Sequence, residues 1–219
     1  LETEEHPVTS GAGLTVAQCM FQGQVGRPGS GDSGGLSVFL RSLGDVLAQT
    51  LQIDRVYTLV LQAAGTSETE YGQLCVQNAP NHFTVNVPVY VEHDFDQHDM
   101  LVNEYALRKA IEWTLKRYHI EPDIFHVRYS DMGSKVVVDV AKQMGKKVVF
   151  TITPDPHRNL ENRFAGQTLD PAQHAELHDK LHTVYISDYI LDQVDGLVAM
   201  PTNSGASHLK AYFPQLELK

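Results

Sequence analysis

The stretch "GSGDSGGLSVFLRSL", residues 29–43, joins a glycine-rich turn to the start of a helix. Before the turn, the apolar run "LTVAQCMF", residues 14–21, predicts a buried strand. A strand, a glycine loop and a helix in this order can bind an anion through the free N–H groups of the helix start. A flexible loop in which Gly34 and Gly35 only ease helix entry fits the stretch equally well. After the turn, apolar side chains recur at helical spacing: Leu36, Phe39, Leu40, Leu43 and Leu47.

The same stretch contains GDSGG, the run around the nucleophilic serine of chymotrypsin-like proteases. That chemistry needs a histidine base and a carboxylate that orients it, and in these proteases both precede the serine. Only His6 lies upstream of Ser33, and a helical pattern follows where the protease continues into a strand. We therefore expect no nucleophilic role for Ser33.

Composition limits the classes of partner. The chain has 219 residues with 42% hydrophobic side chains, enough for one sizeable α/β domain. Its net charge of -10 argues against a nucleic-acid partner, which needs clustered lysine and arginine. No apolar stretch approaches membrane-spanning length, and the N-terminus is acidic rather than signal-like. Cys19 and Cys75 lack CxxC spacing, which indicates free thiols and a reducing, cytoplasmic location.

Strand and helix patterns alternate along the rest of the chain. A polar loop is expected at residues 63–82. Alternation of this kind predicts an α/β fold with a doubly wound, mostly parallel sheet covered on both faces. Ligands of such sheets bind at the carboxyl ends of the strands, which nominates loops 22–35, 90–98, 130–134 and 153–163. We expect strands at 54–62, 83–90, 124–129, 147–154 and 195–201, and helices at 100–118 (capped by Asp99), 132–144, 171–191 and 203–213.

The segment "HVRYSDMGS", residues 126–134, ends a strand in a polar turn that opens a helix. Tyr129, Ser130 and Asp131 would project into the crevice, and Gly133 would ease a close backbone approach. On position alone, the sequence favours Asp131 as the N-cap of the following helix, without contact to a ligand.

The segment "TITPDPHRN", residues 151–159, places Asp155, His157 and Arg158 just beyond another strand end. Two prolines stiffen this loop and hold its side chains at limited entropic cost. The histidine is suited to bind a substrate hydroxyl, and Arg158 is suited to pair with a phosphate or carboxylate. A solvated loop without a ligand is the alternative.

Two histidine-containing stretches raise the question of a metal. His174, His178 and His182 share one helix face, but no companion cysteine or HExxH pattern supports a zinc site. The stretch "EHDFDQHD", residues 92–99, lacks the spacing and central glycine of a calcium loop. We assign no metal to either stretch.

Three motifs in order carry a resemblance to a known family: "GDSGGLSVFLRSLGDVLA", "EPDIFHVRYSDMGS" and "KKVVFTITPDPHRN". Together they resemble retaining GT-B glycosyltransferases of the sucrose synthase and sucrose-phosphate synthase group, over residues 14–213. The D-x-G-G loop of that group is matched by Asp32, Ser33, Gly34 and Gly35. Its PD-x-x-H-x-x-Y-x-D-x-G pattern is matched by Pro122, Asp123, His126, Tyr129, Asp131 and Gly133.

The resemblance implies half of an architecture in which two Rossmann-like domains enclose the active site. Residues 14–213 would be the N-terminal, acceptor-side domain, after a linker at 1–13 and before a link to a C-terminal domain at 214–219. Gly34 and Gly35 would border the phosphate and sugar of the donor. Tyr129, Asp131 and Arg158 would face the acceptor. The family has a sugar-contacting histidine in a GHS- or AHA-like turn, and here "PDPHRN" leaves His157 and Asp155 as the candidates for that catalytic role.

The implied activity is hexosyl transfer from a nucleotide-sugar donor to a sugar or sugar-phosphate acceptor, without a cofactor. The cations that clamp the diphosphate and the carboxylate that grips the ribose are expected in the C-terminal domain. A non-catalytic Rossmann-like regulatory or interaction module is the alternative from another class. A stand-alone α/β nucleotide-binding enzyme is a further alternative, although the chain lacks the G-x-x-x-x-G-K-[ST] phosphate loop.

Overall fold

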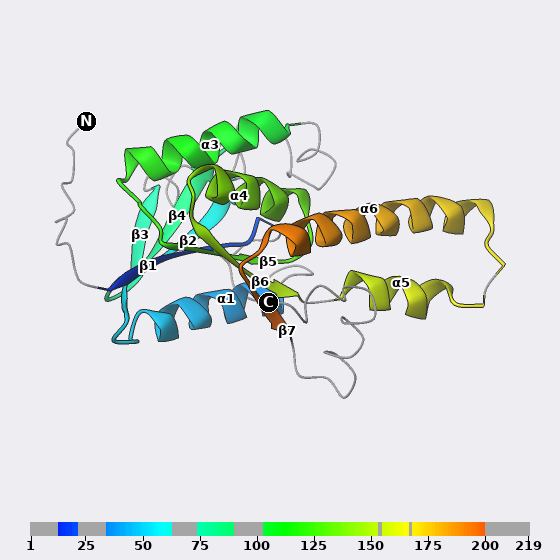
Figure 1. Ribbon diagram of the computed structural model, residues 1–219, viewed down its shortest axis with the longest axis horizontal. Helices are drawn as coiled ribbons and strands as arrows, with labels where there is room; N and C mark the ends of the chain where they lie inside the picture. Colours follow the sequence, from blue (N-terminus) through cyan, green and yellow to red (C-terminus); the bar gives the residue numbers. More distant parts are fainter. Residues whose placement is uncertain are drawn as a thin grey trace.

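The computed structural model describes residues 13–21, 34–62, 74–89, 103–152, 155–166 and 168–199. These residues form a single seven-stranded sheet in the order β3-β4-β2-β1-β5-β6-β7 (Figure 1). All neighbouring strands are parallel except β3 and β4. The strands are β1 (Leu14–Cys19), β2 (Ile53–Gln62), β3 (Cys75–Ala79), β4 (His82–Pro88), β5 (Ile124–Arg128), β6 (Lys147–Ile152) and β7 (Gly196–Ala199).

Helices cover both faces of this sheet. α1 (Gly34–Leu47) packs on one face, whereas α3 (Glu104–Arg117), α4 (Met132–Gln143) and the C-terminal half of α6 (Pro171–Gln193) pack on the other (Figure 1). α5 (Pro156–Phe164) lies against α6, and the two extend beyond the sheet. The α/β class and the doubly wound, mostly parallel sheet predicted from the sequence are therefore confirmed.

The two faces of the sheet differ in chemistry. The face under α3, α4 and α6 is the main hydrophobic core, in which Phe125, Val127 and Phe150 are fully buried. The opposite face carries buried polar side chains at positions that lie in register on neighbouring strands. Burial of polar groups is tolerated when hydrogen bonds satisfy them, and most of this face meets that requirement. Its buried polar residues are Gln18, Thr58, His82, His126, Arg128 and Thr151.

A hydrogen-bonded row connects this polar face to α1. Gln18 donates through Nε2 to the carbonyl of Leu40 at 2.9 Å and to Oγ1 of Thr58 at 2.6 Å. The His82 ring lies between Thr58 and Asp45, 2.7 Å from each. Gly44 of α1 sits directly above this row, because a Cβ there would lie 2.4 Å from His82 and 2.5 Å from Gln18. The helix can therefore approach the row only with glycine at this position.

Two segments expected to be loops contain regular structure. β3 lies inside the predicted loop 63–82, and its polar residues obscured the strand pattern. It forms because a tight turn at Asn81, with φ of 64°, folds it back onto the edge of β4. α5 lies inside the predicted loop 153–163. Pro156 stands in the first turn of that helix, where proline is favoured, and Asp155 caps it. α3 begins at Glu104 rather than Met100.

Several sequence predictions fall outside the described residues. These are most of the linker at 1–13, the glycine loop with Asp32 and Ser33, the charged loop 90–98, the helix at 203–213 and the segment 214–219. In the part of the chain that the structure describes, no helix is long and apolar enough to cross a membrane.

Candidate functional site

The carboxyl ends of β1, β5 and β6 lie together because these strands are parallel neighbours. α4 and α5 begin directly after β5 and β6, and α1 is the next helix after β1. The chain leaves β1 for β2 on one side and later returns to β5 on the other, so the β1–β5 boundary is a topological switch point, where doubly wound sheets bind ligands. Gly34, Asp131 and His157 thus share one edge of the sheet, as predicted.

Direct contacts join the elements across this switch point. The guanidinium of Arg128, the last residue of β5, lies 4.0 Å from the centre of the Phe39 ring on α1. A Cβ on Gly133 would lie 2.8 Å from Cβ and Cδ2 of Phe21, which follows β1. Gly133 therefore eases a close approach, as expected, but the approaching group is the Phe21 side chain.

Asp131 is fully buried and uses only half of its carboxylate. Its Oδ1 accepts a hydrogen bond of 2.6 Å from the Ser134 amide and so caps α4. Its Oδ2 is buried without a hydrogen-bond partner among the described residues. Burial raises the pKa of this carboxyl to about 6. One oxygen of Asp131 thus caps α4, and the other is able to accept a hydrogen bond from a ligand.

Tyr129 has a strained backbone, with φ of 86°. A non-glycine residue in this region costs energy and is concentrated at functional sites. The side chain is half-buried, and burial together with the charge of Asp131 raises its pKa. The neighbouring hydroxyl of Ser130 is buried and has no partner in the described part of the chain.

Arg128 is a functional candidate that the sequence analysis missed. Its side chain is 2% exposed, and Nε and Nη1 find no acceptor among the residues described. Burial lowers its pKa. The signal was present in "IFHVR", where His126 and Arg128 alternate with apolar residues in a strand expected to be buried on both faces.

His126 has a structural role, because it connects two neighbouring strands of the sheet. Its Nε2 lies 2.7 Å from Oγ1 of Thr151 on β6. Burial, with a smaller contribution from the charge of Arg128, lowers its pKa to about 4. The ring is therefore neutral at physiological pH and bridges β5 to β6.

The residues after β6 begin α5. Asp155 accepts from the amides of His157 at 3.0 Å and Arg158 at 3.3 Å, so its carboxylate caps the helix. Nε2 of His157 lies 2.8 Å from Oδ1 of Asp188 on α6, which fixes the orientation of the ring. Arg158 is half-buried in the first turn of the same helix.

Gly34 and Gly35 form the first residues of α1. A Cβ on Gly35 would meet no atom within 4 Å, so packing in the described structure does not require glycine there. The first turn of α1 holds no acidic residue, whereas Asp131 and Asp155 cap the neighbouring helices. A helix start without an acidic residue in its first turn favours an anion.

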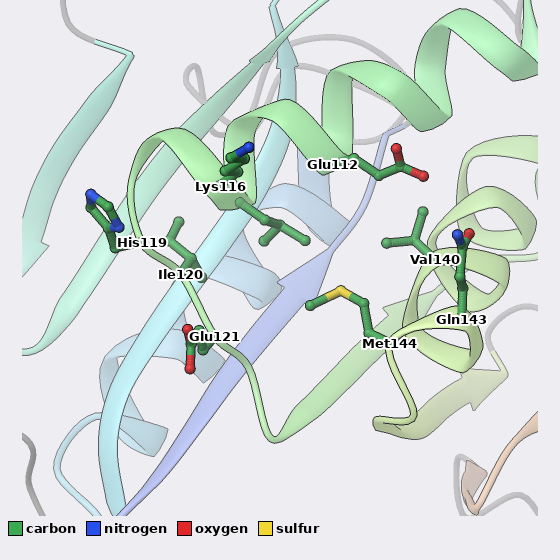
Figure 2. Close-up of a pocket in the computed structure, with 9 residues that line it drawn as sticks. Glu112, Lys116, His119, Ile120, Glu121, Val140, Gln143 and Met144 are labelled. Carbon is green, nitrogen blue, oxygen red and sulfur yellow. The ribbon is translucent and has the colours of Figure 1, made fainter.

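A cavity of about 460 Å³ lies away from this edge, between the C-terminal ends of α3 and α4 (Figure 2). Leu115, Ile120, Val140 and Met144 form part of its lining, together with charged residues such as Glu112 and Lys116. Because α3 and α4 lead into the starts of β5 and β6, the cavity belongs to the amino edge of the sheet. In the described ranges, no group of three or more His, Cys, Asp or Glu residues is arranged to hold a metal.

No protein-family model matches the sequence, and a search of curated proteins finds no match. The fold is similar to a structure of sucrose-phosphate synthase from Thermosynechococcus elongatus, with a TM-score of 0.63 and 13% identity. That match covers 92% of this chain and 45% of the other, so the chain spans less than half of that enzyme structure. A second sucrose-phosphate synthase structure from the same organism gives a TM-score of 0.49 and 12% identity, over 92% of this chain and 96% of the other. The likeness shows an α/β fold that matches half of a GT-B enzyme.

Proposed function

We propose that this chain is the acceptor-side half of a retaining glycosyltransferase. It would move a sugar from a nucleotide-sugar donor to a sugar or sugar-phosphate acceptor. The observation that carries the proposal is a set of buried polar atoms at the carboxyl edge that have no hydrogen-bond partner among the described residues. These atoms belong to Arg128, Ser130 and Asp131. Buried polar groups in proteins are nearly always hydrogen-bonded, so exceptions point to a ligand. The fold shared with sucrose-phosphate synthase supports the choice of reaction.

The acceptor side of the site would be built from the β5–α4 turn and α5. The unpartnered Oδ2 of Asp131 can accept a hydrogen bond from a sugar hydroxyl. Tyr129, whose backbone is strained, lies near enough for the charge of this carboxylate to help raise the pKa of its phenol. Arg158, in the first turn of α5, would pair with an anionic group of the acceptor.

Of the two candidates for the catalytic, sugar-contacting role, His157 fits better than Asp155. The carboxylate of Asp155 already accepts two amide hydrogens of α5. The His157 ring is oriented by Asp188, as a group acting on a substrate hydroxyl must be. Asp155 would then act as a positioning residue that places His157 at the start of the helix.

The donor side would use Gly34 and Gly35. Backbone N–H groups at the start of α1 can stabilise the diphosphate as negative charge develops on the leaving group. We expect the remaining cations, and the carboxylate that grips the nucleotide ribose, in a second domain after Lys219. With protein cations in this role, the transfer requires no metal and no cofactor.

Two alternatives to the transferase are a non-catalytic module and a dinucleotide-binding enzyme. A non-catalytic regulatory or interaction module would keep the fold without the transfer. Residues 29–34, GSGDSG, also fit the G-x-G-x-x-G pattern of dinucleotide-binding enzymes. In that pattern the glycines directly follow the first strand and an acidic residue ends the second. Here β1 already ends at Cys19 and β2 ends at Gln62, which favours the transferase.

The test compares this chain with a longer parent that includes the second domain. Both are incubated with nucleotide sugars and with sugar or sugar-phosphate acceptors, and release of nucleoside diphosphate is measured. We expect transfer by the parent and none by the isolated chain, because losing even one well-placed donor to a developing charge slows catalysis about a hundredfold or more.

Variants of the parent locate the site. Gly34→Val should abolish transfer because its side chain blocks the close backbone approach of the donor. Asp131→Ala should weaken use of the acceptor more than binding of the donor. An inactive parent, or one without a second α/β domain, would favour the non-catalytic module. Full activity in both variants would remove these residues from the site.

A further inference from the structure

The cavity between the C-terminal ends of α3 and α4 has the size and the lining of a small-molecule site. Its volume of about 460 Å³ lies within the range of ligand pockets, roughly 300–1,000 Å³. Part of its lining is core: Leu115, Ile120 and Val140 are at most 4% exposed. Met144 extends toward α3 from the end of α4 and stays 39% exposed (Figure 2). A ligand with an apolar part would gain free energy by covering this surface.

The turn after α3 is strained where it lines this cavity. His119 has a φ of 51°, a left-handed conformation that the chain adopts after α4 at Gly145. The Ile120 amide then donates to the Leu115 carbonyl at 2.8 Å, which folds Ile120 back over the helix end. A side chain in this conformation costs energy that glycine avoids, and such strain is concentrated at functional sites. The His119 ring adds a group in the lining that can form a hydrogen bond with a ligand.

Charged side chains of both signs line the same cavity. Glu112 is already bound by Lys109, at 2.6 Å. Lys116 and Glu121 form no ion pair with any other residue in the part of the chain that the structure describes. A ligand that carries one cation and one anion on an apolar body would supply a partner for each of them. Its own two charges cancel, so binding would add no net charge to the cavity.

We propose that this cavity binds a free amino acid with a large apolar side chain. Lys116 would pair with the carboxylate of the ligand and Glu121 with its ammonium group, while the side chain covers the apolar lining. A small side chain would leave most of that lining in contact with water. The thioether of Met144 favours an aromatic ring, because sulfur and aromatic rings attract each other. The cavity lies at the amino edge of the sheet, so this inference does not depend on the proposed transfer reaction.

The experiment measures binding by calorimetry to this 219-residue chain. The probes are L-phenylalanine, phenylethylamine without the carboxylate, 3-phenylpropanoate without the ammonium group, and glycine without the side chain. Met144→Trp should fill the cavity, whereas Lys116→Met and Glu121→Gln each remove one charge. Arg117→Met is the matched control, because Arg117 is the other basic residue in the last turn of α3 and does not line the cavity.

We expect phenylalanine to bind, and Met144→Trp to abolish its binding. Lys116→Met and Glu121→Gln should each weaken phenylalanine binding about fivefold, the upper range for an exposed ion pair. Lys116→Met should leave phenylethylamine binding unchanged, since that probe has no carboxylate, and Glu121→Gln should leave 3-phenylpropanoate binding unchanged. Arg117→Met should bind every probe as the unmodified chain does. Glycine should show no measurable binding, because it cannot cover the apolar lining.

The proposal is overturned if phenylalanine does not bind, or if Met144→Trp binds it as the unmodified chain does. Phenylethylamine that binds as tightly as phenylalanine would show that the carboxylate makes no contact, and would overturn the assignment to an amino acid. Equal losses in Lys116→Met and Arg117→Met would point to the charge of the helix end and also overturn it. If Met144→Trp melts at a much lower temperature, the two charge variants decide, since both change exposed side chains. Transfer activity does not enter this test, so neither result changes the proposed function.

Discussion

Asp131 gives the clearest consequence at the scale of a single residue, because its folded-state pKa of about 6 lies above the ordinary value for aspartate, about 3.9. The folded protein therefore holds this proton more tightly than the unfolded chain does. The resulting stability is fully present below about pH 4 and is lost as the pH rises through about 6. At neutral pH the buried, ionised carboxylate lowers the stability of the folded protein.

Asp131→Asn should remove that destabilising charge and keep the helix cap, since asparagine caps as well as aspartate. We expect the free energy of unfolding at pH 7.5 to rise, on the order of 2 kcal/mol, with little change at pH 4. Urea unfolding at several pH values measures this.

The control is Asp195→Asn, where the sign reverses. Burial would raise the pKa of Asp195, but hydrogen bonds from Lys142, the Val148 amide and Lys147 hold it below its usual range. This variant should lose stability at pH 7.5. Equal pH profiles for Asp131→Asn and the unmodified chain would contradict the prediction.

At the scale of elements, α6 has two halves that differ in burial and in the elements they pack against. All its buried residues lie in the C-terminal half, namely Val184, Ile186, Ser187, Ile190 and Leu191. Its N-terminal half packs with α5, whose only buried residue is Pro156 (Figure 1). A capping box between Asp170 and Gln173 starts the helix. Hydrogen exchange should therefore be faster in α5 and the first half of α6 than in the second half.

Asp170→Ala should widen this difference in hydrogen exchange by making exchange in the first turns of α6 faster still. Loss of the cap destabilises the first turns by about 1 kcal/mol, which raises local exchange about fivefold. Global unfolding should change little, because the second half of α6 packs independently on the sheet. Asp179→Ala, an exposed position in the same helix, is the control and should leave exchange near the cap unchanged. Equal protection along α6 in the unmodified chain would refute the two-part description.

Sequence patterns were informative for these elements where one rule dominated. Pro171 marked the start of α6, and alternating apolar runs marked the central strands. They failed where two signals conflicted. Pro156 was interpreted as a loop stiffener because Pro154 stands beside it, although it occupies the first turn of α5. β3 lacks apolar alternation, since an exposed edge strand needs little of it.

At the scale of the whole molecule, the order of strands and helices was enough to predict the site edge. Parallel strands must end together, so the turns after β5 and β6 had to meet. The partners of individual side chains could not be predicted. Nothing local in the sequence says that Asp188 orients His157, or that Arg128 lies over Phe39 while its Nε and Nη1 find no acceptor among the described residues. Those contacts depend on residues far apart in the chain.

The β1–β5 boundary also governs the order in which the chain can fold. The Thr15 amide bonds to the Asp123 carboxylate across a sequence separation of 108, whereas the pairs on either side of this boundary join closer segments. Long loops close late because their entropy must be overcome first. Phe21→Leu, at the boundary, should mainly accelerate unfolding, whereas Val85→Ala, within β4, should slow refolding. Stopped-flow kinetics would contradict this if Phe21→Leu slowed refolding as much.

Because we expect the β1–β5 boundary to form late in folding, we also expect it to separate early in unfolding. Separation of β1 from β5 would part Phe39 from Arg128 and Phe21 from Gly133, while the β1–β4 half and the β5–β7 half each keep their own pairing. The proposed binding edge would then be lost before the secondary structure is. A ligand that contacts both halves across the boundary would hold them together and slow their separation.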